Sequence, residues 1–267
     1  MMADRGLTKS GYIGNEISTD NIDEKFLPVV NKVIEELSNK FGELIHSIYL
    51  YGSVGRGDAV PYRSDLDIGL VTYQPVTFEV RKQLDSVATR LDAEFSIVSK
   101  LEFDIGHYQE VMVDNEYEWQ CWLKHFCVCI WGCDLSKHIQ PYRPSVNIGL
   151  EMNQDIQQRL DSAVELVEAG VLDDTGKSIA KKIIRTDYSL YSERDNSFYS
   201  GLEDMVETLI RYKPKEKPVI EEALRIATGI PRDKEALINL VRGYGQDVAN
   251  RVLQMRTVSS ASKCCSP

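Results

Sequence analysis

The 267-residue sequence has no apolar run long enough to span a membrane, and residues 1–20 lack the cationic and apolar blocks of a signal peptide. Both absences predict a cytoplasmic protein with no membrane partner. A basic excess is also missing: 41 acidic residues outnumber 31 basic ones, for a formal net charge of −10. Proteins that grip a nucleic-acid backbone carry basic patches, so a long nucleic acid is not expected as a substrate. A small cationic molecule is compatible with this charge.

The six cysteines include no Cys-x2-Cys pair, which is the spacing that structural zinc sites commonly use. Cys127 and Cys129 fall within one strand-like apolar run. In a chain of this length without a secretory signal, the cysteines are interpreted as reduced thiols, most of them buried.

A glycine-rich stretch is the strongest local signal. Residues 47–71 predict a strand, a turn that opens a short helix, and a second strand. Gly52, Gly55 and Gly57 mark a place where the backbone turns tightly or comes close to another group.

Two acids enter the second of these strands. Because side chains alternate along a strand, Asp65 and Asp67 are expected to point to one face. Adjacent carboxylates repel each other unless a cation lies between them, and their hard oxygens suit Mg2+. Gly52 and Ser53 would offer N–H groups and a hydroxyl to a phosphate chain. Asp65 and Asp67 could instead be solvated turn residues, but that interpretation leaves the glycine turn unexplained.

The order of these residues resembles the signature of the DNA polymerase β-like nucleotidyltransferase superfamily, and within it the bacterial aminoglycoside adenylyltransferases of the streptomycin and spectinomycin type. The resemblance rests on Gly52-Ser53, Arg56-Gly57 and Ser64-Asp65-Leu66-Asp67. It implies that Asp65 and Asp67 hold Mg2+ and that ATP is the nucleotidyl donor. The nucleotide-binding residues that it implies in this part of the chain are Gly52, Ser53, Arg56 and Ser64.

A third carboxylate is expected on the next predicted strand, residues 93–98. Alternation places Glu94 and Ser96 on one face of it. By resemblance, Glu94 would accept the proton of the substrate hydroxyl and contact the metal. Asp92 would take this role if the strand register is shifted by two residues, and an acid on an exposed sheet face is a further alternative.

The fold class predicted is α+β, with a mixed β-sheet flanked by helices followed by a helical bundle. Pro141 and Pro144 bracket a linker, after which apolar residues recur at helical spacing. The predicted domains are a nucleotidyltransferase domain at 1–143, a helical domain at 144–257 that closes on substrate or nucleotide, and a disordered tail at 258–267.

Two basic residues of the helical domain lie one turn apart on one predicted helix face, Lys181 and Arg185. The resemblance implies that the arginine of the Arg185-Thr186-Asp187-Tyr188 run helps to hold ATP, and Lys181 could reach the triphosphate oxygens. A later lysine of the family has no evident counterpart near Ser200.

These residues predict metal-dependent transfer of AMP from ATP to a hydroxyl of a small polyhydroxylated, cationic acceptor of the aminoglycoside type, with release of pyrophosphate. Glu94, Asp187, Glu193 and Asp195 could contact its ammonium groups. Two alternatives stay open: a toxin-like nucleotidyltransferase that modifies a protein or tRNA, and a non-catalytic nucleotide-binding module. The sequence does not decide between a monomer and a homodimer.

Overall fold

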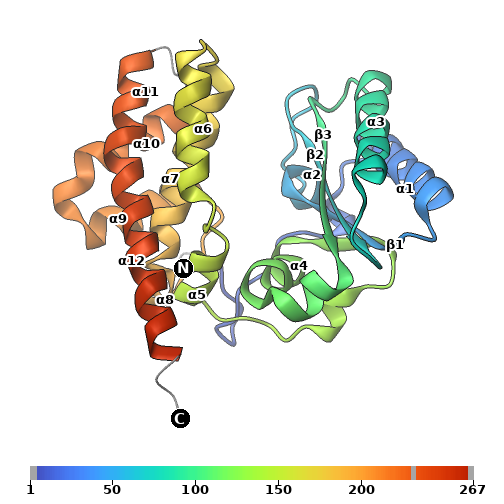
Figure 1. Cartoon of the computed structure of the whole chain (residues 1–267), viewed down its shortest axis with the longest axis horizontal. Coiled ribbons are helices and arrows are strands. Elements are labelled where there is room, and N and C mark those ends of the chain that lie inside the picture. The colour runs from blue at the N-terminus through green and yellow to red at the C-terminus, as the bar shows by residue number, and fades with distance from the viewer. Residues whose placement is uncertain (1–4, 230–232, 264–267) are drawn as a thin grey trace. The chain divides into compact units, whose positions relative to one another are not determined.

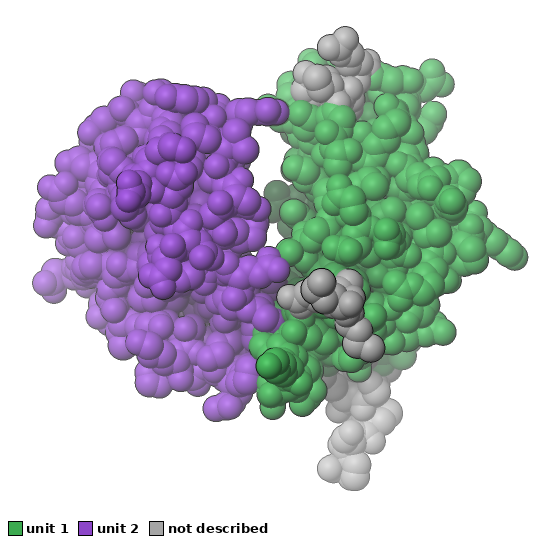
Figure 2. Space-filling model, turned by 180° about the vertical axis from the view of Figure 1, so that it is seen from behind, with its two compact units in different colours: residues 1–13, 143–267 green, residues 14–142 purple. Residues whose placement is uncertain are grey.

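The structure is a computed structural model that describes residues 5–229 and 233–263. The chain divides into two compact units (Figure 1): residues 14–142 form one, and residues 1–13 together with 143–267 form the other. Figure 2 colours the first purple and the second green. The first unit contains a mixed sheet with flanking helices and the second consists mainly of helices, which confirms the predicted α+β class. None of the described helices is both long and apolar enough to cross a membrane.

The first unit, called the sheet unit here, is built on four strands in the order β3-β2-β1-β4. Strand β2 pairs in parallel with β3 and antiparallel with β1, and β1 pairs antiparallel with β4. The strands are β1 Ile45–Tyr51, β2 Leu66–Thr72, β3 Leu101–His107 and β4 Val128–Gly132. The helices are α1 Leu27–Phe41, α2 Gly52–Arg56, α3 Phe78–Glu94 and α4 Cys121–Phe126.

The two faces of this sheet have different partners because side chains alternate along each strand. Leu66, Ile68 and Leu70 of β2 are fully buried in a core shared with α1 and α3. Val71 points to the opposite face, where it joins a smaller cluster that includes Leu123 of α4. Asp67 and Gly69 alternate with the core residues and therefore belong to this second face.

The second unit, called the helical unit here, is centred on α7 Asp173–Ser189, which packs against α6, α9 and α10. Ala180, Ile183 and Ile184 of α7 are fully buried in its core. The other helices are α5 Val146–Glu151, α6 Ile156–Glu168, α8 Ser192–Asp195, α9 Leu202–Tyr212, α10 Lys217–Thr228, α11 Lys234–Leu240 and α12 Gln246–Lys263.

Both chain ends differ from the boundaries expected from the sequence. Residues 1–13 group with the helical unit rather than with the sheet unit, and the Phe198 N–H donates a 2.8 Å hydrogen bond to the carbonyl of Arg5. Helix α12 continues to Lys263, into the stretch expected to be a disordered tail. The remainder of that tail, 264–267, lies outside the described residues.

The cysteines of the described part of the chain all have free thiols. Cys121 and Cys127 are buried, Cys129 is half-buried and Cys133 is exposed. Burial raises the pKa of the Cys121 thiol to about 12, so this side chain stays neutral and unreactive.

Candidate active site

The glycine turn and the second acid of β2 lie directly against each other. Gly52 begins α2 with φ +72°, a backbone conformation that favours glycine. A Cβ atom on Gly52 would lie 1.9 Å from the Oδ2 atom of Asp67. The missing side chain therefore makes room for the Asp67 carboxylate beside the start of α2.

Asp65 lies just before β2 and accepts a hydrogen bond from the hydroxyl of Ser99. The same hydroxyl donates to the carbonyl of Arg63 at 3.0 Å, so Ser99 ties the loop before β3 to the entry of β2. Asp65 is exposed and Asp67 is half-buried. Their spacing of two residues places both acids on the sheet face away from α1 and α3.

The strand predicted at 93–98 is wrong, and with it the position expected for Glu94. Helix α3 runs to Glu94, and the Phe95 N–H closes its last turn on the carbonyl of Leu91. Glu94 is exposed and forms an ion pair with Arg90 on the same helix at 3.5 Å. The alternative residue, Asp92, also lies on α3. The apolar residues at helical spacing from Val80 to Leu91 form one continuous helix, and the short alternating run that follows them does not form a strand.

The strand beside β2 in the sheet is β3, and it carries two acids on the sheet face away from α1 and α3, called the site face here. Its residue Glu102 is the direct partner of Asp67 in the parallel β2–β3 ladder, and Asp104 is the partner of Gly69. Both acids are exposed, whereas Leu101 and Phe103 are buried. Glu102 thus stands where Glu94 was expected. The alternation from 101 to 105 is visible in the sequence and could have identified this strand.

Negative charge accumulates around Asp67. Burial is the main cause that raises the pKa of Asp67 to about 7, and the charges of Asp65, Glu102 and Asp104 raise it further. The guanidinium of Arg56 acts in the opposite direction. These four acids therefore hold more negative charge than the adjacent protein cations compensate, which is the electrostatic condition that favours a bound cation.

Aromatic side chains border the acids on the same face. The Tyr51 hydroxyl donates to the Asp104 carboxylate, and the Tyr51 ring lies edge-on to Trp122 at 4.7 Å between centroids. A Cβ atom on Gly69 would lie 2.8 Å from Trp122, and one on Gly106 would lie 2.7 Å from Trp119. The indoles therefore rest on the bare backbone of β2 and β3 beside the carboxylates, with an angle of 83° between their ring planes.

The remaining residues expected near the turn have local contacts. The Ser53 carbonyl accepts hydrogen bonds from the N–H groups of Gly57 and Asp58, at 3.0 and 3.2 Å. Arg56 pairs with Asp58 at 3.1 Å and stays exposed. The Ser64 hydroxyl accepts a 2.9 Å hydrogen bond from the Val60 N–H and so closes the turn before β2.

Residues 30–116 match the family model described as "Nucleotidyltransferase domain". The matched segment spans β1 to β3 and includes the glycine turn and all four acids. Residues 30–116 form a nucleotidyltransferase domain. The prediction of a nucleotidyltransferase is confirmed.

Most of the chain is similar in fold to a solved structure, spectinomycin adenyltransferase AAD(9) from Enterococcus faecialis, which was crystallised with ATP and spectinomycin. The TM-score is 0.54 and the identity 15%, over 83% of this chain and 98% of that chain. This likeness extends the agreement in fold beyond the nucleotidyltransferase domain. No curated protein matches the sequence.

The carboxylates of the nucleotidyltransferase domain fit a magnesium ion by their chemistry. Asp65, Asp67 and Glu102 provide the hard oxygen ligands that Mg2+ prefers, and the charges of Asp65, Glu102 and Asp104 add to the burial that raises the pKa of Asp67. Within residues 5–229 and 233–263, no three acidic, cysteine or histidine side chains converge tightly enough to hold a metal ion as they stand. Binding would require the exposed acids, Asp65 and Glu102, to turn toward the ion.

The two basic residues expected to bind phosphate lie outside the nucleotidyltransferase domain, on α7 of the helical unit. Lys181 is half-buried and Arg185 is exposed. A neighbour on α7, Lys182, forms an ion pair with Asp155 at 2.9 Å. The role of Lys181 and Arg185 toward a nucleotide stays a prediction.

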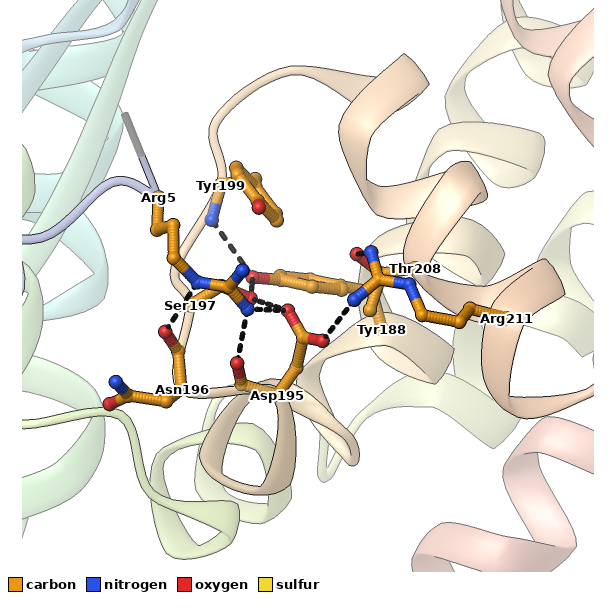
Figure 3. A network of polar contacts seen from close by, with 8 residues as sticks. All are labelled: Arg5, Tyr188, Asp195, Asn196, Ser197, Tyr199, Thr208 and Arg211. Atoms are coloured by element: carbon orange, nitrogen blue, oxygen red, sulfur yellow. Dashed lines mark hydrogen bonds and ion pairs between the residues drawn. The ribbon is translucent and has the colours of Figure 1, made fainter. Parts of the chain in front are cut away.

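Two acids considered for binding an acceptor are instead committed to the helical unit itself. Asp195 is buried and contacts Arg5 at 2.6 Å, Arg211 at 2.7 Å and the Ser197 hydroxyl at 2.7 Å (Figure 3). Asp187 is fully buried and pairs with Lys213, with Arg251 at 3.1 Å, and with a tyrosine hydroxyl. Protein cations thus already neutralise both carboxylates.

Glu193, also considered for binding an acceptor, accepts a 2.8 Å hydrogen bond from the Val146 N–H at the start of α5. Its side chain therefore stabilises the first turn of a helix. Glu193 is exposed, unlike Asp187 and Asp195.

Proposed function

We propose that the chain transfers AMP from ATP to a hydroxyl group of a small polyhydroxylated acceptor and releases pyrophosphate. The observation that carries the proposal is the pair Asp67 and Glu102, in register on one sheet face beside the Gly52 turn. An acceptor of the aminoglycoside or spectinomycin type is supported by the similarity in fold to a spectinomycin adenyltransferase and by the acidic charge of the chain.

The phosphate chain of ATP would be received at the start of α2. Gly52 and Ser53 present N–H groups there, and Arg56 is exposed close enough to Asp67 to influence its charge. Mg2+, held by Asp65, Asp67 and Glu102, would supply charge neutralisation at the triphosphate. Lys181 and Arg185 are proposed to bind the nucleotide, as the resemblance to the adenylyltransferases implies for Arg185.

Glu102 takes the role that the sequence assigned to Glu94. Its carboxylate would accept the proton of the acceptor hydroxyl as that oxygen forms a bond to the α-phosphorus of ATP. The bond between the α-phosphorus and the bridging oxygen breaks at the same centre, and pyrophosphate leaves. The indoles of Trp119 and Trp122 border the acids and would offer apolar contacts to a sugar ring.

A pyrophosphate-release screen tests this proposal. Purified protein would be incubated with Mg2+ and ATP, GTP, CTP or UTP against aminoglycosides, lincosamides and spectinomycin, with Asp67→Asn as the inactive control. Release that depends on ATP, on one of these acceptors and on Asp67 would support it. Labelling of added protein or tRNA instead would favour the toxin-like alternative, and nucleotide binding without any release would favour a binding module.

A further inference from the structure

A lysine stands among the acids of the site face. Asp65 and Lys100 directly precede Leu66 and Leu101, which are partners in the parallel ladder, and the Leu66 N–H donates a 2.8 Å hydrogen bond to the Lys100 carbonyl. Lys100 lies two residues before Glu102, as Asp65 lies two before Asp67. The two strands therefore present on one face the ammonium of Lys100 and the four carboxylates of Asp65, Asp67, Glu102 and Asp104.

The Lys100 ammonium forms an ion pair with the Glu102 carboxylate. This hydrogen bond is the main cause that raises the pKa of Lys100, and the charges of Asp65 and Asp92 raise it as well. Asp92 has one oxygen that is buried and has no hydrogen-bond partner among the described residues. Lys100 therefore places a positive charge directly against Glu102, whereas the charge of Arg56 acts on Asp67.

We propose that Lys100 is a positioning residue of the nucleotidyl-transfer site, which holds Glu102 when no metal is bound and competes with a divalent cation for its carboxylate. This inference rests on the function proposed above. It explains why the acids carry metal-binding chemistry yet do not converge as a finished metal site: Glu102 is turned to Lys100.

The competition follows from the chemistry of the carboxylate. An ammonium group and a divalent ion both use the lone pairs of the Glu102 oxygens, and two positive charges within a few ångströms repel each other. Removal of the ammonium would free the ligand and remove the repulsion. The Lys100 and Glu102 side chains are 58% and 48% exposed, so water and salt weaken the pair and the metal can displace it.

The chain offers a matched control for this pair. Lys25 pairs with Asp23 at 3.1 Å, with the same spacing of two residues and similar exposure, 62% and 45%. Both pairs belong to the sheet unit, but Lys25 and Asp23 precede α1 and lie outside the strands of the sheet. Lys25→Met therefore removes an equivalent ion pair without touching the acids on β2 and β3.

The experiment measures Mn2+ binding to nucleotide-free protein by electron paramagnetic resonance, for wild type, Lys100→Met, Lys100→Arg and Lys25→Met. Circular dichroism would verify that each variant is folded. Lys100→Met should bind Mn2+ about three- to tenfold more tightly than wild type. Lys100→Arg and Lys25→Met should bind it as wild type does, because each retains a cation beside Glu102.

Equal or weaker Mn2+ binding by Lys100→Met would overturn the inference. If Asp67→Asn still lost Mn2+ binding in that case, the metal assignment of the proposed function would stand and only the role of Lys100 would fall. Absence of Mn2+ binding to wild type and Lys100→Met alike would overturn both.

Discussion

Asp67 on β2 and Glu102 on β3 are direct partners in a parallel ladder, so their side chains leave the sheet side by side on the face opposite α1 and α3. The helix α3 and the loop after it separate the two residues in the chain. The pair is therefore a product of strand pairing. It makes Glu102, rather than Glu94, the acid to test.

Glu102→Gln should lower kcat about 10²- to 10⁴-fold and leave ATP binding near the wild-type level, because the amide keeps the shape of the side chain but cannot accept the proton. Glu94→Gln is the matched control and should be fully active, since Glu94 pairs only with Arg90 among the contacts described. The measurement is steady-state pyrophosphate release, with ATP binding by calorimetry. An inactive Glu94→Gln beside an active Glu102→Gln would reverse the assignment.

Gly52→Ala should destabilise the protein by about 3 kcal/mol and abolish transfer. The new methyl group would overlap the Asp67 carboxylate, and the positive φ of residue 52 is unfavourable for alanine. Gly170→Ala isolates the backbone effect: Gly170 has φ +95° and nothing within 4 Å of a Cβ atom. That control should cost about 1 kcal/mol and leave activity intact. Urea denaturation compares the two, and equal losses would rule out the contact with Asp67.

The pKa of Asp67 predicts how stability depends on pH. It is about 7 in the folded protein against an ordinary value of 3.8. Between these values the folded state holds a proton that the unfolded state has released, so stability falls as pH rises from 4 to 7 and stays low above it. Asp67→Asn removes the charge and should stabilise the metal-free protein by about 2 kcal/mol at pH 8.

At pH 4 the same substitution should have little effect on stability, because Asp67 is then protonated in the folded state. Denaturation at both pH values without divalent ions measures the difference. An Asp67→Asn effect of equal size at pH 4 and pH 8 would contradict the raised pKa.

Asp187→Ala should destabilise the protein by about 3–5 kcal/mol, because the buried Lys213 loses its fully buried partner and keeps only the more exposed Glu216. Glu221→Ala breaks the exposed pair with Lys217 and should cost at most about 0.5 kcal/mol. Thermal denaturation compares the two variants. An Asp187→Ala protein of wild-type stability, with a raised KM for a cationic acceptor, would restore Asp187 as a substrate contact.

Local patterns predicted much of the sheet unit. The strand, glycine turn and second strand at 47–71 fold as expected, because Gly52 and Gly57 adopt positive φ angles that few other residues tolerate. The error at 93–98 came from a short alternating run that carries no information on where a preceding helix ends. The packing of Leu84 and Leu91 in the core stabilises the helix up to this point, and an alternating pattern of so few residues does not predict a strand reliably.

The sequence by itself determined the α+β class, the glycine turn and the two acids of β2, because these depend on neighbouring residues and on the alternation of one strand. Only the tertiary structure decided which acid joins them and that Lys100 stands among them, since both follow from the register of β3 against β2. It likewise assigned Asp187 and Asp195 to buried ion pairs, because their partners are distant in the chain. Contacts of this kind join segments that are far apart in the sequence, and a local sequence pattern does not show which distant segments come together.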